Sequence, residues 1–223
     1  VSQAVDGMEE LALKVRARER KVGITDRILQ DFERRAFALS GSSQLLWAVD
    51  QTLARLQSVP LRPGPVLKVG IVGEIFTMLE PFTNLDIPRM LGQMGVEVSV
   101  SMRLSSWITD HILKLKFWQE PEIREAARPY LRTFVGGHAQ ETLGHAIRYA
   151  KEGYDGIIQL FPLTCLPEIV AESILPSVSE DYGIPLMVLV TDEMSGRAGY
   201  RTRLEAFVDM LEQRKEKEHV SWY

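Results

Sequence analysis

The sequence is poor in cysteine and contains no long hydrophobic run, and both shortages exclude classes of protein. Its 223 residues include one cysteine, so no internal disulfide can form, and a reducing, cytoplasmic setting is the default expectation. No uninterrupted apolar stretch approaches the ~20 residues that a membrane-spanning helix needs. The glycine-rich phosphate-binding motifs of nucleotide-binding proteins and the His-Glu-x-x-His motif of zinc proteases are also missing.

An excess of positive charge is missing as well. Lys and Arg together number 26 against 30 Asp and Glu, which gives a net charge of −4. Proteins that bind nucleic acid through its phosphates usually carry clustered positive charge. Hydrophobic residues make up 45% and charged residues 25%, values that exclude a wholly disordered or fibrous chain. We therefore expect a globular protein with neither a nucleic-acid nor a membrane partner.

The start of the chain carries no targeting signal. It begins at Val1, and the charged, helical stretch that follows is unlike the apolar segment of a signal peptide. Because no initiator methionine is present, we expect the sequence to be a fragment of a longer protein. At roughly 150 residues per domain, its length allows one large domain, or one domain with an appendage.

Residues 1–58 show helical patterns and no convincing strand. Glu9–Lys21 is rich in good helix formers. Thr25 and Asp26, or the turn beside them, are predicted to cap a second helix, whose apolar residues recur at helical spacing. We interpret this segment as a helical layer that covers a neighbouring domain. A proline-rich stretch at 59–65 then predicts an extended linker.

From residue 66 onward, short β-branched runs alternate with helical patterns. The predicted strands are Val66–Val72, Val96–Val100, Gly156–Phe161 and Pro185–Val190. The predicted helices are Asn84–Met94, Trp107–Trp118, Glu122–Phe134, Glu141–Glu152, Pro167–Asp181 and Arg201–Lys217. This alternation predicts an α/β lobe over 66–223, built on a mostly parallel sheet of about four strands.

Parallel α/β sheets bind ligands beyond the carboxyl ends of their strands, and this rule selects a set of loop residues. Glu74, Cys165 and Asp192 follow the first, third and fourth predicted strands, and Thr164 precedes the cysteine. Cys165 lies near the start of a helix, whose N–H groups favour a thiolate that is a nucleophile or a ligand for iron. The alternative is a small buried hydrophobe, which is the ordinary role of a free cysteine.

Two further groups are candidates for anion binding. Gly136 and Gly137 lead into a predicted helix, whose first N–H groups are suited to an anion. Arg201 and Arg203 open the last helix and can clamp a phosphate or a carboxylate. The alternatives are an ordinary loop and arginines that pair with nearby carboxylates.

Six short motifs occur in order along Val66–Gln213. They are Gly73–Ile75, Glu80–Asn84, Asp155–Ile158, Pro162–Pro167, Tyr182–Pro185 and Arg201–Phe207. Together they resemble the C-terminal half of the 2-hydroxyacyl-CoA dehydratase component family, including the group described as acyl-CoA dehydratase activase-related. The resemblance does not extend to residues 1–58.

The resemblance implies a Rossmann-like or flavodoxin-like lobe beside a four-iron–four-sulfur (4Fe-4S) cluster held by cysteine thiolates. It also implies a partner, either an ATP-dependent iron–sulfur activator protein or a sister lobe or subunit, and an acyl-CoA substrate for a lyase reaction. Cys165 matches a cysteine of the family, and the role of cluster ligand is carried over to this residue alone. Glu74, Thr164 and Asp192 are then expected to line the same crevice.

The sequence departs from the family in its cysteine content. A cubane cluster needs about four protein ligands, whereas this chain offers one cysteine. Either the remaining ligands lie outside the chain or this homologue has lost the cluster. We expect the first, so that the isolated chain holds no cluster and is inactive. The alternatives are a non-catalytic binding or assembly lobe, and a CoA- or nucleotide-binding module that uses the two glycines and two arginines named above.

Overall fold

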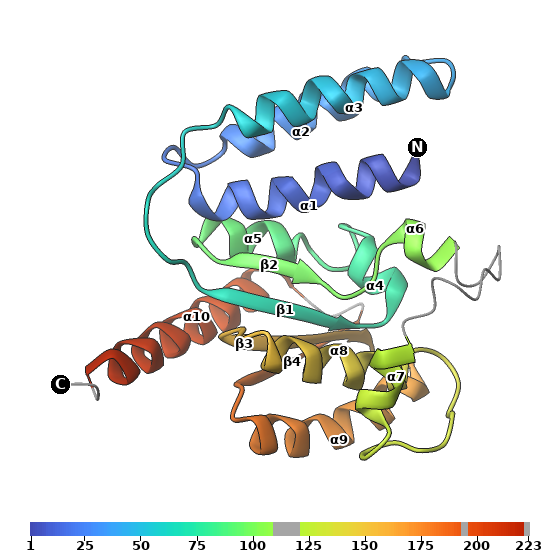
Figure 1. Ribbon diagram of the computed structural model, residues 1–223, viewed down its shortest axis with the longest axis vertical. Helices are drawn as coiled ribbons and strands as arrows, with labels where there is room; N and C mark the ends of the chain where they lie inside the picture. Colours follow the sequence, from blue (N-terminus) through green and yellow to red (C-terminus); the bar gives the residue numbers. More distant parts are fainter. Residues whose placement is uncertain (109–120, 193–195, 221–223) are drawn as a thin grey trace. The chain divides into compact units, whose positions relative to one another are not determined.

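The computed structural model describes residues 1–108, 121–192 and 196–220 (Figure 1). The chain divides into two compact units. Unit 1 comprises Val1–Val66 and Pro88–Val98, and unit 2 comprises Leu67–Ile87 and Ser99–Tyr223. The boundaries predicted at residues 58 and 65 stay a prediction of domain organisation, and residues 88–98 group with the N-terminal helices. None of the helices in the described ranges is long and apolar enough to cross a membrane.

Unit 1 is built on three helices that share an apolar core. They are α1 (Ser2–Arg18), α2 (Ile24–Ala36) and α3 (Ser42–Gln57). Their buried side chains include Met8, Val15, Phe32, Val49 and Leu56. Apolar residues at helical spacing therefore give unit 1 a continuous core, as the sequence pattern indicates.

The start of α2 is capped by the flanking turn, one of the two predicted possibilities. Its N-cap is Gly23, and Thr25 and Asp26 lie inside the first turn rather than capping it. The carboxylate of Glu19 accepts hydrogen bonds from the backbone N–H groups of Gly23 and Thr25 and from the Thr25 hydroxyl. A side chain that precedes the helix thus satisfies its free N–H groups, which leaves Asp26 available for another role.

Asp26 forms a buried ion cluster in unit 1. Its carboxylate accepts hydrogen bonds from Arg16 Nε at 2.9 Å, Arg89 Nε at 3.0 Å and Gln93 Nε2 at 2.8 Å. Burial opposes ionisation, but the hydrogen bond from Gln93, the charge of Arg16 and the hydrogen bonds from Arg16 and Arg89 hold the pKa of Asp26 below its usual range. Residues 88–98 join unit 1 partly through these contacts.

The α/β fold predicted from the sequence is confirmed. The strands are β1 (Lys68–Gly73), β2 (Glu97–Val100), β3 (Gly156–Pro162) and β4 (Leu186–Thr191). They form a four-stranded parallel sheet in the order β2-β1-β3-β4. Because β2 and β3 lie on opposite sides of β1, the winding of the sheet reverses between β1 and β3, which is where α/β sheets bind their ligands.

The helices follow the predicted pattern with shifted ends. They are α5 (Ile87–Gln93), α7 (Pro121–Ala127), α8 (Ala139–Lys151), α9 (Leu166–Tyr182) and α10 (Arg197–Val220). Two short helices were not predicted, α4 (Ile75–Leu79) and α6 (Leu104–Trp107). Most of the helix expected at Trp107–Trp118 lies outside the described residues.

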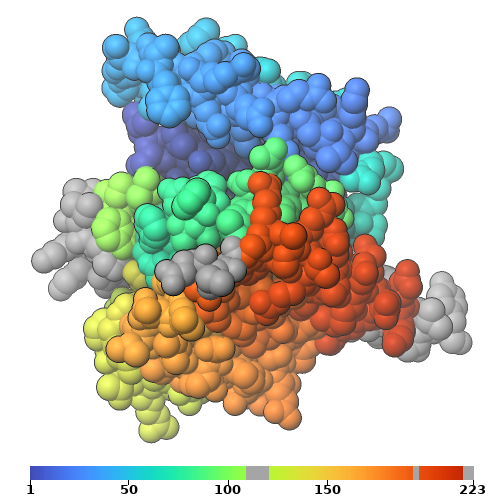
Figure 2. All heavy atoms as spheres, turned by 180° about the vertical axis from the view of Figure 1, so that it is seen from behind, coloured from blue at the N-terminus to red at the C-terminus, as the bar shows by residue number. Residues whose placement is uncertain are grey.

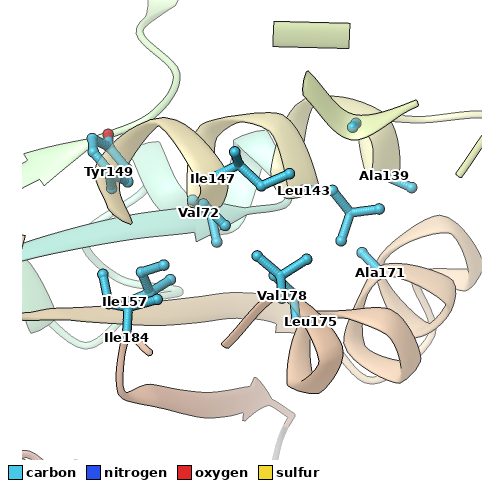
Figure 3. Packing of buried hydrophobic residues seen from close by; sticks show 12 residues of the cluster. Val72, Ala139, Leu143, Ile147, Tyr149, Ile157, Ala171, Leu175, Val178 and Ile184 are labelled. Carbon is cyan, nitrogen blue, oxygen red and sulfur yellow. The ribbon is translucent and has the colours of Figure 1, made fainter. Parts of the chain in front are cut away.

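Helices cover both faces of the sheet in unit 2. On one face, α8 and α9 pack on β1 and β3 through a buried cluster that includes Val72, Leu143, Ile157 and Leu175 (Figure 3). The other face is covered by α10. This is seen at Gly156, where an added Cβ would lie 2.9 Å from the side chain of Phe207 on α10. Neighbouring strand residues point to opposite faces, so Gly156 and Ile157 mark the two layers. The outer surface of α10 is drawn in red in Figure 2.

Candidate functional site

The first part of the site is the end of β1. The strand finishes at Gly73, whose φ of 139° falls in a region that side chains disfavour, and an added Cβ would lie 1.9 Å from the carbonyl oxygen of Leu160. This close approach lets the N–H of Glu74 donate to the same oxygen at 3.0 Å. Glycine at this position therefore brings Glu74 against the carboxyl half of β3, at the point where the winding reverses.

Glu74 caps the short helix α4. Its carboxylate accepts hydrogen bonds from the backbone N–H groups of Phe76 at 2.9 Å and Thr77 at 2.8 Å, and from the Thr77 hydroxyl at 2.9 Å. A carboxylate at a helix start satisfies N–H groups that have no partner within the helix. The side chain predicted to line the crevice thus also fixes the turn that follows β1.

The second part of the site is the turn between β3 and α9. Cys165 is the N-cap of α9, and its N–H donates to Pro162 O at 2.9 Å, while its carbonyl accepts from Ile169 N at 3.0 Å. The N–H of Leu163 donates to Thr191 O at 3.1 Å, at the end of β4. Residue Asp192 follows directly. The four residues predicted to line the crevice therefore lie at one edge of the sheet, after β1, β3 and β4, with Cys165 half-buried and Thr164 exposed.

The protonation of Cys165 differs from the sequence-based expectation. Burial raises the pKa of its thiol, and the carboxylates of Glu168 and Glu74 raise it further, against an opposing effect of the Glu168 N–H. A cysteine at a helix start was expected to have a lowered pKa. The shift has the opposite direction because burial of the thiol, together with the two carboxylates, outweighs the hydrogen bond from the Glu168 N–H.

Glu168, which the sequence analysis did not select, is a buried carboxyl beside this turn. Only 1% of its surface is exposed. The Thr142 hydroxyl donates to its carboxylate at 2.9 and 3.1 Å, and Gln159 Nε2 donates at 3.0 Å both to the carboxylate and to the main-chain oxygen of Glu168. Burial raises the pKa of Glu168 to about 7, although these hydrogen bonds oppose the rise, and the carboxylates of Glu74 and Glu141 add to it. The signal in the sequence was Gln159, a polar residue inside an otherwise apolar strand.

The two predicted anion-binding pairs lie on different faces of the sheet. A Cβ added to Gly137 would lie 2.8 Å from the Pro167 side chain, so the start of α8 meets the start of α9. Arg201 and Arg203 lie on α10, on the opposite face, where Arg201 pairs with Glu205 at 2.9 Å and Arg203 donates to Val188 O at 2.9 Å. The structure does not bring the glycines and the arginines together into one clamp.

Large apolar side chains are exposed around the turns that carry Glu74 and Cys165. Phe76 follows Glu74 and is 62% exposed, whereas Leu163 and Leu166, on either side of Cys165, are 58% and 73% exposed. Phe82, in the loop after α4, is 87% exposed. We call these four residues the apolar rim. Exposed apolar side chains in this number near a polar edge are typical of a surface that another protein covers.

The donor set does not by itself fit a metal cluster. Across residues 1–108, 121–192 and 196–220, no group of three or more His, Cys, Asp or Glu side chains is arranged to hold a metal ion. Cys165 supplies one thiol, whereas a cubane cluster takes about four ligands. No protein-family model and no curated protein matches the chain.

Proposed function

We propose that unit 2 is one lobe of an iron–sulfur redox protein of the kind to which its motifs are similar, the 2-hydroxyacyl-CoA dehydratase components. In this proposal Cys165 contributes one ligand to a 4Fe-4S cluster. The other thiolates come from another polypeptide or lobe, because the chain has no second cysteine. The observation that carries the proposal is the position of Cys165, half-buried at the carboxyl edge where the winding of the sheet reverses.

The apolar rim supports the idea of a site completed by a partner. Its side chains stand exposed on the turns after β1 and β3 and in the loop after α4. Covering them removes apolar surface from water, which favours association. The partner proposed is an ATP-dependent iron–sulfur activator protein or a sister lobe that brings the missing ligands. A small acyl-CoA is the substrate class that the resemblance implies.

The residues of the chain have defined tasks in this proposal. Glu74 holds the turn after β1 through its helix cap, and Pro162 and Ile169 fix the backbone of Cys165. When bound, the cluster supplies one-electron reducing chemistry. Iron binds the thiolate, so Cys165 must release its proton to act as a ligand. The raised pKa of the thiol makes this release less favourable, and iron binding is expected to weaken as the pH falls.

The test is the iron content of the protein. The chain is produced together with any sequence that flanks it in its gene, purified without oxygen, and assayed for iron, sulfide and visible absorption. We expect Cys165→Ser to lose the cluster and its brown absorption, whereas the control Ser173→Ala, at an exposed position later in α9, keeps both. A colourless wild-type protein after anaerobic reconstitution, or full iron content in Cys165→Ser, would contradict the proposal.

A second candidate is a binding or assembly lobe without redox chemistry. The apolar rim favours it equally, and the raised pKa of Cys165 fits a thiol that is not a ligand. The two proposed functions differ in whether they require the sulfur atom of Cys165. If the lobe serves only assembly, Cys165→Ser binds its partner as wild type does, whereas Leu166→Asp on the apolar rim abolishes binding in a pull-down.

A further inference from the structure

Three polar side chains lie together inside the apolar core of unit 2. Thr142 on α8, Gln159 on β3 and Glu168 on α9 are 2%, 0% and 1% exposed. We call them the buried polar cluster. In the described part of the chain, the Gln159 side-chain oxygen has no hydrogen-bond partner. Burying a carboxyl and leaving an amide oxygen unpaired both cost free energy, so packing alone does not explain this arrangement.

The hydrogen bonds of the cluster converge on the first turn of α9. Gln159 Nε2 reaches both the main-chain oxygen and the carboxylate of Glu168, each at 3.0 Å. This pair of bonds ties the helix start to the middle of β3, across the loop that contains Cys165. Thr142 binds the same carboxylate from α8 at 2.9 Å. The turn that carries the thiol is thereby held from the strand and from the neighbouring helix.

We propose that Thr142, Gln159 and Glu168 are positioning residues for the thiol of Cys165. The inference rests on the proposed function, in which this sulfur is a ligand and its place relative to the carboxyl edge matters. Hydrogen bonds between these side chains fix the orientation of the turn, whereas apolar side chains of similar size would allow the turn to shift. Proline at 162 and 167 restricts the same turn from the backbone side. Burial of these polar groups lowers the stability of the fold, but their hydrogen bonds hold the thiol at one position.

The test uses the reactivity of the thiol. Cys165 is the sole cysteine, so alkylation of the 223-residue chain by iodoacetamide at one fixed pH reports on this residue alone. Gln159→Leu removes both bonds to Glu168 and keeps a similar side-chain size. We expect it to raise the alkylation rate by about three- to tenfold, the factor that corresponds to about one lost hydrogen bond.

The matched control is Val178→Ala. Val178 is fully buried in the same core, on a later turn of α9, and its truncation destabilises the fold without removing a hydrogen bond. We expect its alkylation rate to stay within about twofold of wild type, because the native turn remains in place. An equal rise in Gln159→Leu and Val178→Ala shows a merely structural role and overturns the inference. No rise in Gln159→Leu overturns it as well.

A second pair of variants decides the question if Gln159→Leu does not fold. Thr142→Val removes the hydroxyl donor and keeps the shape, whereas Thr142→Ser keeps the donor. We expect faster alkylation in the valine variant and a wild-type rate in the serine variant; equal rates in the two variants contradict the positioning role. Because no iron is involved, a chain that fails the iron test yet shows these rates loses the proposed function and keeps the positioning role of the cluster.

Discussion

Asp26 in unit 1 and Glu168 in unit 2 are both buried carboxyls, but they have different partners. Asp26, 7% exposed, is surrounded by Arg16, Arg89 and Gln93. Glu168, 1% exposed, accepts hydrogen bonds from the neutral side chains of Thr142 and Gln159. The pKa of Asp26 is lowered and that of Glu168 is raised to about 7. Cationic partners keep a buried carboxyl ionised, whereas neutral donors leave it close to its titration point at physiological pH.

The largest effect is expected when the ion cluster of unit 1 is broken. Asp26→Ala leaves the guanidinium of Arg16, 5% exposed, without its buried counter-ion. We expect the free energy of unfolding to fall by about 3–5 kcal/mol, as for other buried pairs that lose one partner. Chemical denaturation followed by circular dichroism measures the change.

The control is Glu10→Ala, which breaks an exposed pair with Lys14 on α1. Exposed pairs are weak because water screens their charges, so the denaturation midpoint should move far less. If the two substitutions destabilise the protein equally, the ion cluster around Asp26 does not act as a buried pair.

The next largest effect concerns Glu168, whose replacement is expected to raise the free energy of unfolding relative to wild type at high pH rather than lower it. Raising its pKa from 4.5 to about 7 corresponds to roughly 3 kcal/mol. The folded state binds the proton more tightly than the unfolded state, so this stabilisation is complete below pH 4.5 and is lost as the pH rises to about 7. Glu168→Gln removes the titrating group. Relative to wild type, we expect this variant to gain about 3 kcal/mol between pH 4.5 and pH 8.

The measurement is the free energy of unfolding of both proteins across this pH range. Val178→Ala, an apolar truncation in the same core, should be displaced from wild type by the same amount at every pH. A difference between Glu168→Gln and wild type that does not change with pH would show that Glu168 keeps an ordinary pKa, and the contrast with Asp26 would be lost.

The smallest expected effect tests how much the neutral hydrogen-bond donors contribute to the pKa of Glu168. Thr142→Val removes a hydrogen bond that stabilises the Glu168 carboxylate, so the pKa of Glu168 should rise further, by about half a unit to one unit. The pH at which the decline in stability ends should move upward by the same amount, while the decline still begins near pH 4.5. Thr52→Val in unit 1 is the control, since the Thr52 hydroxyl is buried but donates to a main-chain oxygen, that of Ala48. An unchanged transition in Thr142→Val would mean that burial alone sets the pKa.

Most of the fold was predictable because its signals are local. The β-branched runs that form β1 and β3 are buried along nearly their whole length, as expected for strands covered on both faces. The ends of helices were harder to predict. The start of α4 is capped by the Glu74 carboxylate, which accepts hydrogen bonds from the N–H groups of Phe76 and Thr77. The start of α2 is capped from outside by Glu19. Such contacts depend on side-chain geometry, which hydrophobic periodicity does not encode.

The site was predictable in position and less so in chemistry. The rule that ligands bind beyond the carboxyl ends of strands selected Glu74, Cys165 and Asp192, and they lie at one edge. Burial is the main cause of the raised pKa of Cys165, and the carboxylates of Glu168 and Glu74 add to it. Glu168 itself has a partner, Thr142, that is 26 residues away along the chain. The roles assigned to these residues, and to Gly136 and Arg201, stay predictions.

The single thiol also makes the carboxyl edge of the sheet easy to observe. Cys165 is flanked by the exposed Leu163 and Leu166, and the chain contains no other cysteine. A fluorophore or spin label attached to the sulfur therefore occupies one known location without any substitution elsewhere. Its emission or mobility should change when a macromolecule covers this edge, so candidate binders can be screened by titration against the labelled chain.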